Sequence, residues 1–323
     1  MSKIQIAIIG GGPIGIAAGI EAQKRGLSYQ IIEKGSLNNS IRNFPTGLTF
    51  FSTPEMLEID DKPFTSVNVR PTRDEVLRYY EKVTLKHQLN LKLYTKVENV
   101  SGEDGNFSLD LSDGTTIESE KVILATGYFD HPNPVNVPGE DQHHVTHYYD
   151  EGFAYTGTDA LVVGGMNSAV ETSLDLFRHG ANVTLVVREA ELGDKVKPWI
   201  RPDIENRIKE GSIQAFFNTE LKEINKKHTM VINHQTNEEW YQKSDFVFLM
   251  TGYRPDEALF RSMGIEMDEE SLVPTLDAQF QTNRRGLYIA GSASAGCKPS
   301  LVFIENGVEH SRIIVEDIAS KLS

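Results

Sequence analysis

One pattern occurs twice in this sequence and decides what the chain can fold into: an apolar strand, a glycine-rich turn and a helix. The first copy is IQIAIIGGGPIGIAAGI at 4–20, and the second is ALVVGGMNSAVETSLDLFRHG at 160–180. A further pair, VILATGY at 122–128 and VFLMTGY at 247–253, differs at only two of its seven positions. Continuous apolar runs are typical of strands buried on both faces of a parallel sheet. The duplication therefore predicts an α/β chain with two Rossmann-like, three-layer dinucleotide-binding domains.

The order of these copies predicts how the two domains share the 323 residues. After the second copy come a strand, GLYIAG at 286–291, and a helix from about Pro299 onward. A strand followed by a helix cannot bury a core by itself, so we expect this tail to complete the first domain. The first domain is then discontinuous, residues 1–127 and 253–323, and the second domain, residues 128–252, is inserted in it.

Two local signals lie between the copies. Residues 72–87 fit a helix that Thr72 caps, with Glu75 three positions later as the partner in a capping box. Around residues 107–119 apolar and polar residues alternate, and the sequence SDG marks a hairpin turn between two strands.

The first glycine-rich turn satisfies the dinucleotide fingerprint Gly-x-Gly-x-x-Gly with Gly10, Gly12 and Gly15. The first glycine makes a tight turn, the second lets the backbone approach a pyrophosphate, and the third lets the helix pack close to the strand. The helix N-terminus then presents its partial positive charge to the phosphates. Glu33 ends the next strand, where its carboxylate can accept hydrogen bonds from a ribose diol.

The second turn, GGMNSA, departs from this fingerprint because Met166 occupies the second glycine position. A side chain there obstructs a pyrophosphate, although Asn167 and Ser168 can still donate hydrogen bonds. Arg188 ends the next strand, where an NAD-binding domain usually has a carboxylate, and an arginine there can pair with the 2′-phosphate of NADPH. Because the carboxylate Glu189 lies beside it, NADH stays an alternative cofactor. The alternative interpretation of Arg188 is a solvated charge at the end of a strand. We predict NADPH for the second domain.

Two dinucleotide folds in one chain, one interrupting the other, imply hydride transfer from a nicotinamide to a flavin, with FAD in the first domain. The helix after Pro299 should point its N-terminus at the N1–C2 carbonyl edge of the flavin. Cys297 lies in the loop before this helix. Because a helix N-terminus lowers the pKa of a thiol, Cys297 is the candidate redox residue, and an inert small residue is the alternative.

Charge and cysteine content restrict the partners and the compartment. A formal net charge of −14 argues against nucleic acid and against an anionic membrane surface as partners. A single cysteine excludes an intramolecular disulfide framework and a multi-cysteine zinc site, and it suits a reducing compartment. The glycines and Pro13 interrupt the apolar N-terminal run, so we do not expect a signal peptide, and no membrane span is expected either. We therefore predict a cytoplasmic protein.

Other catalytic signals are weak. His131, His143, His144 and His147 cluster in the sequence, but no carboxylate or thiol constellation accompanies them, so we predict no metal site. The sequence also has no Gly-x-Ser-x-Gly elbow, so hydrolase chemistry has no support.

Several segments together carry a family resemblance. They are the first glycine turn with its helix, NSIRNFPTGLTFFS at 39–52, ATGYFDHPNPVNVPGED at 125–141, GGMNSAVETSLDL at 164–176, KPW at 197–199, MTGYRPD at 250–256 and FIENG at 303–307. With these segments the chain resembles the YpdA-type bacillithiol disulfide reductases, which are thioredoxin-reductase-like flavoenzymes. The resemblance implies a thioredoxin-reductase-like fold, FAD and NADPH as cofactors, a homodimer, and the reduction of a low-molecular-weight disulfide.

The resemblance also implies which residues contact the cofactors. For FAD these are Gly10, Gly12, Pro13, Ile14, Gly15, Glu33, Lys34, Asn43, Phe50, Val97, Ala125, Thr126, Gly127 and Gly291. For NADPH they are Gly165, Met166, Asn167, Ser168, Arg188 and Lys197.

Two departures from the family leave the electron acceptor open. Thioredoxin reductases carry a Cys-x-x-Cys pair in the nicotinamide domain, and this chain has none, so a dithiol relay to thioredoxin is excluded. The bacillithiol enzymes commonly have a cysteine inside the first glycine turn, where this chain has Ile14, and Cys297 is the candidate substitute. The leading hypothesis is reduction of a small disulfide. The alternatives are a flavoenzyme without thiol chemistry, namely a monooxygenase-like enzyme, an NADPH oxidase or a ferredoxin or flavodoxin reductase, and a nucleotide-binding regulatory protein.

Overall fold

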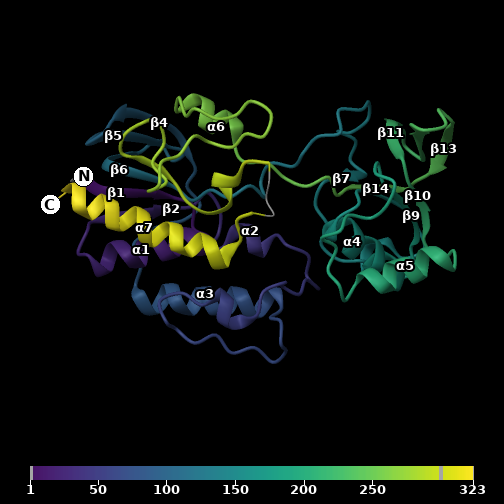
Figure 1. Cartoon of the computed structure of the whole chain (residues 1–323), viewed down its shortest axis with the longest axis horizontal. Helices are drawn as coiled ribbons and strands as arrows, with labels where there is room; N and C mark the ends of the chain where they lie inside the picture. Colours follow the sequence, from purple (N-terminus) through teal and green to yellow (C-terminus); the bar gives the residue numbers. More distant parts are fainter. Residues whose placement is uncertain (1–2, 298–300, 323) are drawn as a thin grey trace. The chain divides into compact units, whose positions relative to one another are not determined.

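The computed structural model describes residues 3–297 and 301–322, and the chain forms two compact units (Figure 1). The first unit comprises Met1–Asn43, Leu48–His131 and Tyr253–Ser323. The second unit comprises Phe44–Gly47 and Pro132–Gly252.

The first unit is built on a seven-stranded sheet. Its parallel part has the strand order β3 (Leu91–Lys92), β2 (Tyr29–Ile32), β1 (Ile4–Ile9), β6 (Thr116–Leu124) and β15 (Leu287–Ile289). Two further strands, β4 (Val97–Glu103) and β5 (Asn106–Leu111), form an antiparallel meander with the first half of β6. The strand β6 therefore belongs to both layers, and the hairpin predicted from the alternating pattern is the one between β5 and β6.

The apolar strands of this unit are buried on both faces, as a parallel sheet requires. Along β1, Ala7 and Ile9 pack into the core that contains Phe107 of the meander, whereas Ile8 faces α1 (Pro13–Lys24), where Gly15 approaches it. Figure 1 shows α7 (Ile304–Leu322) beside α1, so the unit has three layers: helices, parallel sheet and meander.

The other elements of the first unit surround this core. They are α2 (Asn39–Arg42), η1 (Pro54–Leu57), α3 (Arg73–His87), α6 (Glu257–Ser262) and the 3₁₀ turn η3 (Gly291–Ala295). The predicted capping box is present at α3, where Thr72 accepts the Glu75 N–H and Glu75 accepts the Thr72 N–H. The last helix, expected from about Pro299, begins at Ile304, and Pro299 itself lies outside the described residues.

The second unit has a five-stranded parallel sheet and a separate three-stranded antiparallel sheet. The parallel order is β10 (Gln214–Phe216), β9 (Asn182–Val186), β8 (Asp159–Val163), β14 (Phe246–Leu249) and β7 (Val145–Thr146). The antiparallel sheet contains β11 (Thr219–Ile224), β12 (His228–Asn233) and β13 (Glu239–Lys243). The helical elements are η2 (Phe153–Tyr155), α4 (Asn167–Arg178) and α5 (Arg201–Lys209).

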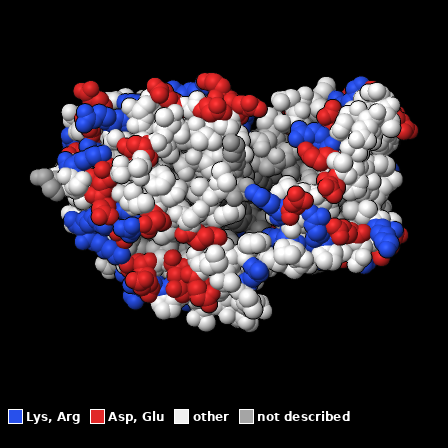
Figure 2. Space-filling view, viewed as in Figure 1, with Lys and Arg blue, Asp and Glu red and all other residues white. Residues whose placement is uncertain are grey.

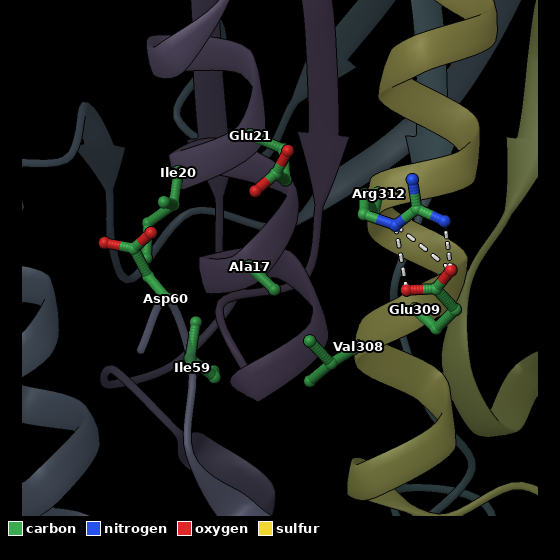
Figure 3. A pocket seen from close by; sticks show the side chains of 8 residues that line it. All are labelled: Ala17, Ile20, Glu21, Ile59, Asp60, Val308, Glu309 and Arg312. Carbon is green, nitrogen blue, oxygen red and sulfur yellow. Dashed lines mark hydrogen bonds and ion pairs between the residues drawn. The ribbon is translucent and has the colours of Figure 1, made fainter. Parts of the chain in front are cut away.

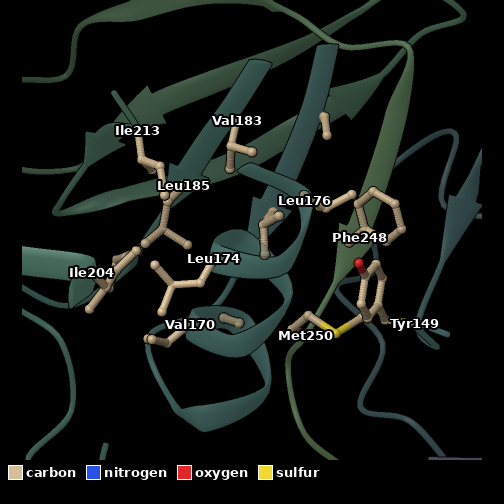
Figure 4. Packing of buried hydrophobic residues seen from close by; sticks show 14 of the residues in the cluster. Tyr149, Val170, Leu174, Leu176, Val183, Leu185, Ile204, Ile213, Phe248 and Met250 are labelled. Carbon is tan, nitrogen blue, oxygen red and sulfur yellow. The ribbon is translucent and has the colours of Figure 1, made fainter. Parts of the chain in front are cut away.

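The second unit repeats the three layers of the first. On one face of its parallel sheet, Leu185 and Phe248 belong to a core with Leu174 of α4 (Figure 4). On the opposite face, Val186 and Val247 pack against the antiparallel sheet. In each unit, the strand that follows the glycine turn and its helix (β2 or β9) lies on one side of the strand before the turn (β1 or β8). The strand that leads into the duplicated heptapeptide (β6 or β14) lies on the other side of that strand. The prediction of an α/β chain with two Rossmann-like folds is confirmed.

Candidate functional site

The first glycine turn connects β1 to α1, and each of its glycines has its own surroundings. Gly10 has φ +116°, and a Cβ there would lie 2.3 Å from the carbonyl oxygen of Ala125. A Cβ on Gly15 would lie 1.9 Å from the Gly10 carbonyl oxygen. A Cβ on Gly12 would meet no atom within 4 Å. The protein's own packing thus requires glycine at 10 and 15, whereas the space at Gly12 is open to a bound group such as a pyrophosphate.

Glu33, the residue after β2, is bound to this turn through its side-chain carboxylate. Its carboxylate accepts the Gly11 N–H at 2.7 Å and the Gly35 N–H at 2.8 Å, and the residue is only 7% exposed. Its backbone N–H donates to the Lys92 carbonyl at 2.9 Å, and its own carbonyl accepts the Thr95 N–H at 2.9 Å. Each carboxylate oxygen has a second lone pair, so Glu33 can still accept a ribose hydroxyl.

Three buried polar atoms in the loops around the first turn have no hydrogen-bond partner within the described residues. They are Ser36 Oγ, Asn38 Oδ1 and Thr126 Oγ1. Asn38 donates its own N–H to the Gly11 carbonyl at 3.0 Å, and Thr126 follows the Ala125 carbonyl that limits Gly10. An unsatisfied buried polar group costs about 1–3 kcal/mol, so these atoms fit a polar cofactor that would satisfy them.

Ile14 lies where the turn meets the C-terminal tail. A Cβ on Gly291 would lie 2.8 Å from Ile14 Cγ1, and a Cβ on Gly307 would lie 2.9 Å from Ile14 Cδ1. The Ser311 hydroxyl donates to the Ile14 carbonyl at 2.9 Å. The structure therefore brings together Ile14 and Gly291, which are far apart in the sequence, and two glycines make room for the branched side chain of Ile14.

The other residues predicted for the first unit are more scattered. Lys34 Nζ pairs with Asp130 Oδ2 at 2.8 Å, and Val97 is buried in the core at the start of β4. Asn43 is exposed and caps α2, and Phe50 is partly buried. Gly127, with φ +68°, follows β6 in the segment whose Ala125 limits Gly10.

Cys297 lacks the activation that was expected of it. Its N–H donates to the Ser271 carbonyl at 2.7 Å, and its side chain is partly exposed. Burial raises the pKa of the Cys297 thiol, Glu257 raises it further, and Arg254 opposes both. The expectation of a lowered pKa is wrong, because the nearest described helix start after Cys297 is Ile304 and burial disfavours the thiolate.

The second turn repeats the backbone of the first. Gly164 has φ +135°, and a Cβ there would lie 2.5 Å from the Met250 carbonyl oxygen. In the first turn, a Cβ on Gly10 would likewise lie close to the Ala125 carbonyl oxygen. The Gly164 N–H donates to the Val186 carbonyl at 2.9 Å, just as the Gly10 N–H donates to the residue that ends β2. The two turns therefore share the conformation of their first glycine and this backbone hydrogen bond.

The register of this copy corrects one sequence expectation. The strand β9 ends at Val186, and Val187, not Arg188, occupies the place of Glu33. Val187 donates its N–H to the Phe216 carbonyl at 2.9 Å and accepts the Thr219 N–H at 3.0 Å, which are the two contacts that Glu33 makes in the first unit. Arg188 lies one residue further, at the position of Lys34.

The residues of the turn itself are engaged with the loop that follows β9. A Cβ on Gly193 would lie 2.1 Å from the Met166 sulfur, so this thioether rests on Gly193. The Asn167 amide donates to the Lys195 carbonyl at 3.0 Å and accepts the Lys197 N–H at 2.7 Å. Ser168 is exposed at the start of α4.

The two cations predicted to contact NADPH, Arg188 and Lys197, differ in exposure. The Arg188 side chain is 72% exposed, and its guanidinium donates to Glu189 Oε1 at 3.1 and 3.2 Å. Lys197 is only 8% exposed at its side chain, and its Nζ lies 2.5 Å from Glu171 Oε1. Arg188 can exchange its partner at little cost, whereas Lys197 is part of a buried ion pair.

Sequence reasoning missed residues that only the fold reveals. One is Val187, which is found from the register of β9 and not from its residue type. Arg201 is another: its Nη2 donates to the Leu192 and Gly193 carbonyls at 3.3 and 2.5 Å and so holds the loop over the second turn.

Among the described residues the structure contains no group of three or more His, Cys, Asp or Glu side chains arranged to hold a metal ion. The clustered histidines have other contacts, for example His131 with Asp256 at 3.3 Å and His147 with Glu140 at 3.1 Å. No helix of the described part of the chain is long and apolar enough to cross a membrane. On the face drawn in Figure 2, acidic and basic side chains are interspersed.

A pocket of about 90 Å³ lies between α1, α7 and the loop at residues 59–60 (Figure 3). It contains no residue of the first glycine turn. Its three carboxylates are already paired, Glu21 with Lys24 at 2.9 Å, Asp60 with Lys62 at 2.9 Å and Glu309 with Arg312. This pocket therefore offers no unpaired charge for catalysis.

Comparison with known proteins gives a consistent family. The model of the pyridine nucleotide-disulphide oxidoreductases matches residues 7–291. The bacilliredoxin reductase Bdr of Bacillus subtilis (strain 168) is 38% identical over 323 residues, which cover 99% of each chain. The structure of the bacillithiol disulfide reductase Bdr (YpdA) from Bacillus cereus superimposes with a TM-score of 0.96 at 39% identity, covering 99% of this chain and 100% of that one. The enzyme of the same name from Staphylococcus aureus gives a TM-score of 0.96 at 34% identity, with 100% of both chains covered.

Proposed function

The chain belongs to the pyridine nucleotide-disulphide oxidoreductase family, and we propose that it is an NADPH-dependent flavoenzyme that reduces a low-molecular-weight disulfide of the bacillithiol type. The observation that carries this proposal is the pair of matching dinucleotide turns within one chain. The relatives that match nearly the whole chain at 34–39% identity are bacilliredoxin and bacillithiol disulfide reductases by name, which favours a disulfide over oxygen or ferredoxin as acceptor.

FAD is assigned to the predicted domain of residues 1–127 and 253–323. The open space at Gly12 and the N-terminus of α1 would take its pyrophosphate, and Glu33 would accept a ribose hydroxyl. The buried unpaired oxygen of Thr126 supports a polar ligand at the same turn. The remaining FAD contacts are proposed from the family pattern, and they include Lys34, Asn43, Phe50, Val97 and Gly291.

NADPH is assigned to residues 128–252. The N-terminus of α4, with Asn167 and Ser168 in its first turn, would face the pyrophosphate, and Arg188 would pair with the 2′-phosphate. When both cofactors are bound, FAD would pass two electrons from NADPH to the disulfide, and the disulfide would take up these electrons and two protons to give two thiols. The contribution of the protein is to position both nucleotides and to keep their phosphates neutralised.

Cys297 is the single cysteine of the chain, so a mixed disulfide between protein and substrate can form at no other residue. We expect Cys297→Ser to lower disulfide turnover by at least about tenfold while NADPH still reduces the flavin. Because burial raises the thiol pKa, wild-type turnover should rise with pH across the range above neutrality. Turnover that is unchanged in the variant would show that the disulfide is reduced without a protein thiol.

We also propose that the protein is a homodimer and that it lies in the cytoplasm. Sedimentation of the purified, FAD-loaded protein measures the oligomeric state, and a monomer at micromolar concentration would contradict the homodimer.

One spectroscopic experiment tests the function. The purified protein should show a flavin spectrum that NADPH bleaches under anaerobic conditions, and the colour should return when bacillithiol disulfide is added. Oxygen and ferredoxin serve as the competing acceptors. If oxygen or ferredoxin restores the colour and the disulfide does not, the flavoenzyme without thiol chemistry is the better description. Failure of both NADPH and NADH to bleach the flavin would contradict every enzymatic proposal.

A further inference from the structure

Met166 occupies the place in the second turn that Gly12 occupies in the first. Each is the N-cap of the helix after its turn and has an extended backbone. The Gly12 carbonyl accepts the Ile16 N–H at 2.9 Å, and the Met166 carbonyl accepts the Val170 N–H at 3.1 Å. A Cβ on Gly12 would meet open space, whereas Met166 brings a whole side chain to the corresponding position. The second turn can therefore admit a pyrophosphate only if this side chain points elsewhere.

The Met166 side chain lies against the loop that follows β9. A Cβ on Gly193 would be 2.1 Å from the Met166 sulfur and 3.5 Å from its terminal methyl carbon. Such a close approach requires that residue 193 has no side chain. Met166 is 44% exposed, so its thioether rests on the surface of the loop and not inside a core. Methionine is unbranched and flexible, and this side chain keeps its place only while the space at Gly193 is free.

Gly193 has no other evident reason to be glycine. Its backbone has no positive φ, so its conformation does not demand glycine. A Cβ on Gly193 would lie 3.5 Å from the Gly165 carbonyl oxygen, which is an ordinary contact. Within the described part of the chain, the Met166 sulfur is the only atom that this Cβ would approach more closely than 3.5 Å. The lack of a side chain at Gly193 thus serves Met166.

The first unit has the reverse arrangement. There Asn38 donates its N–H to the Gly11 carbonyl at 3.0 Å, as Gly193 donates its N–H to the Gly165 carbonyl at 2.9 Å. Asn38 and Gly193 therefore occupy equivalent places in the loops after β2 and β9. The first unit combines a glycine at the helix N-cap with a side chain in the loop, and the second unit combines a side chain at the N-cap with a glycine in the loop. Each copy has one side chain at this pair of positions.

Hydrogen bonds hold the loop in place around Gly193. Its N–H donates to the Gly165 carbonyl at 2.9 Å. Its carbonyl accepts the Val196 N–H at 3.1 Å and Arg201 Nη2 at 2.5 Å. Because these contacts fix the backbone on both sides of residue 193, a side chain added there would displace the exposed Met166 thioether and not the loop.

We propose that Gly193 is a positioning residue for the dinucleotide of the second unit, because it provides the space that keeps the Met166 thioether away from the N-terminus of α4. This inference rests on the proposed function, in which this helix N-terminus faces the pyrophosphate of NADPH. With a Cβ at residue 193, the Met166 side chain turns to another staggered rotamer and competes with the pyrophosphate for the open side of the turn. Gly193 itself needs no contact with the nucleotide.

The experiment measures binding of NADP⁺ to the FAD-loaded protein by calorimetry. NADP⁺ has no hydride to donate, so the flavin stays oxidised during the titration. Gly193→Ala should weaken NADP⁺ binding by at least about fivefold, because the displaced thioether crowds the pyrophosphate. Met166→Ala should bind NADP⁺ at least as tightly as the wild type, to within about twofold. In the Met166→Ala background, Gly193→Ala should have no further effect, because no sulfur remains to be displaced.

A second measurement needs no nucleotide. With isotope-labelled methionine methyl groups, the nuclear magnetic resonance signal that Met166→Ala removes identifies Met166. Gly193→Ala should shift this signal, because the thioether leaves the loop. The buried Met263 of the first unit is the matched control, and its signal should stay where it is. The flavin absorbance per chain shows that each variant is folded and loaded.

Equal affinity of the wild type and Gly193→Ala for NADP⁺ would overturn the inference and leave the proposed function standing. A loss of affinity that Met166→Ala does not rescue would also overturn it, and so would an unchanged Met166 methyl signal in Gly193→Ala. A wild type that binds neither NADP⁺ nor NAD⁺ would overturn the proposed function together with the inference. The expected NADP⁺ affinities without disulfide turnover would support the inference and refute only the acceptor.

Discussion

At the scale of single residues, the three fingerprint glycines have different reasons to be glycine. Gly10 and Gly15 are required by the backbone of the protein, which would collide with a Cβ at 2.3 and 1.9 Å. Gly12, the N-cap of α1, has open space around it, which leaves room for a ligand at this helix N-terminus. The crowding at Gly10 and Gly15 and the open space at Gly12 agree with the separate roles that the fingerprint predicts for the three glycines.

This difference predicts opposite effects of the same substitution. Gly12→Ala should change the free energy of unfolding of the cofactor-free protein by less than about 0.5 kcal/mol while weakening FAD binding. Gly10→Ala should destabilise the cofactor-free protein by roughly 1–3 kcal/mol, because it combines a collision with a positive φ. Urea unfolding without FAD and a flavin-binding titration measure both quantities. A Gly12→Ala protein that binds FAD as well as the wild type would contradict the pyrophosphate position.

At the scale of elements, local signals predicted α3 well and α7 less well. The capping box of α3 is a contact between residues three apart, so it is visible in the sequence. The start of α7 depends on the Asn306 side chain, which accepts the Phe303 N–H at 2.7 Å and donates to the Leu301 carbonyl at 2.9 Å. The distant Ser52 also donates to Glu305 at 2.7 Å. Such contacts are not readable from helix propensity.

The capping box gives a pH dependence that can be measured. Hydrogen bonds from the Thr72 and Val67 N–H groups lower the pKa of Glu75 to about 2 from its usual value of 4.5. A lowered carboxyl pKa contributes stability above the usual value, and this contribution is lost as the pH falls from about 4.5 toward 2.

We therefore expect Glu75→Gln to cost about 1 kcal/mol near neutral pH, the typical value of a helix cap. The difference in free energy of unfolding between wild type and variant should shrink as the pH is lowered through this range. Denaturant titrations at a series of pH values provide the measurement, and a difference that stays constant down to about pH 2.5 would contradict the role of the charged form.

At the scale of the whole molecule, the chain consists of two copies of one three-layer fold. The copies agree in strand order around the glycine turn and in the hydrogen bonds of Glu33 and Val187. They differ in the residue that follows the second strand, which is a carboxylate in the first copy, Glu33, and a valine in the second, Val187. The internal copy thus serves as a reference structure for the second site.

Cofactor removal should reveal the two units separately. A ligand at one hundred times its Kd stabilises the unit that binds it by about 2.7 kcal/mol. Stripping FAD should lower the transition temperature of the first unit, and adding NADPH should raise only that of the second. Scanning calorimetry, with hydrogen exchange to assign each transition, provides the test. If both cofactors protect the same unit, the assignment of FAD and NADPH to separate units is wrong.

The sequence by itself determined the fold class, the two glycine turns, the position of Glu33 and the presence of isoleucine, not cysteine, at position 14. These features are local or periodic, so they are legible from neighbouring residues. Only the tertiary structure decided that Val187, and not Arg188, takes the place of Glu33, because strand register depends on hydrogen bonds to Phe216 and Thr219. It also decided that the pKa of Cys297 is raised, because burial is set by packing against residues far away in the chain.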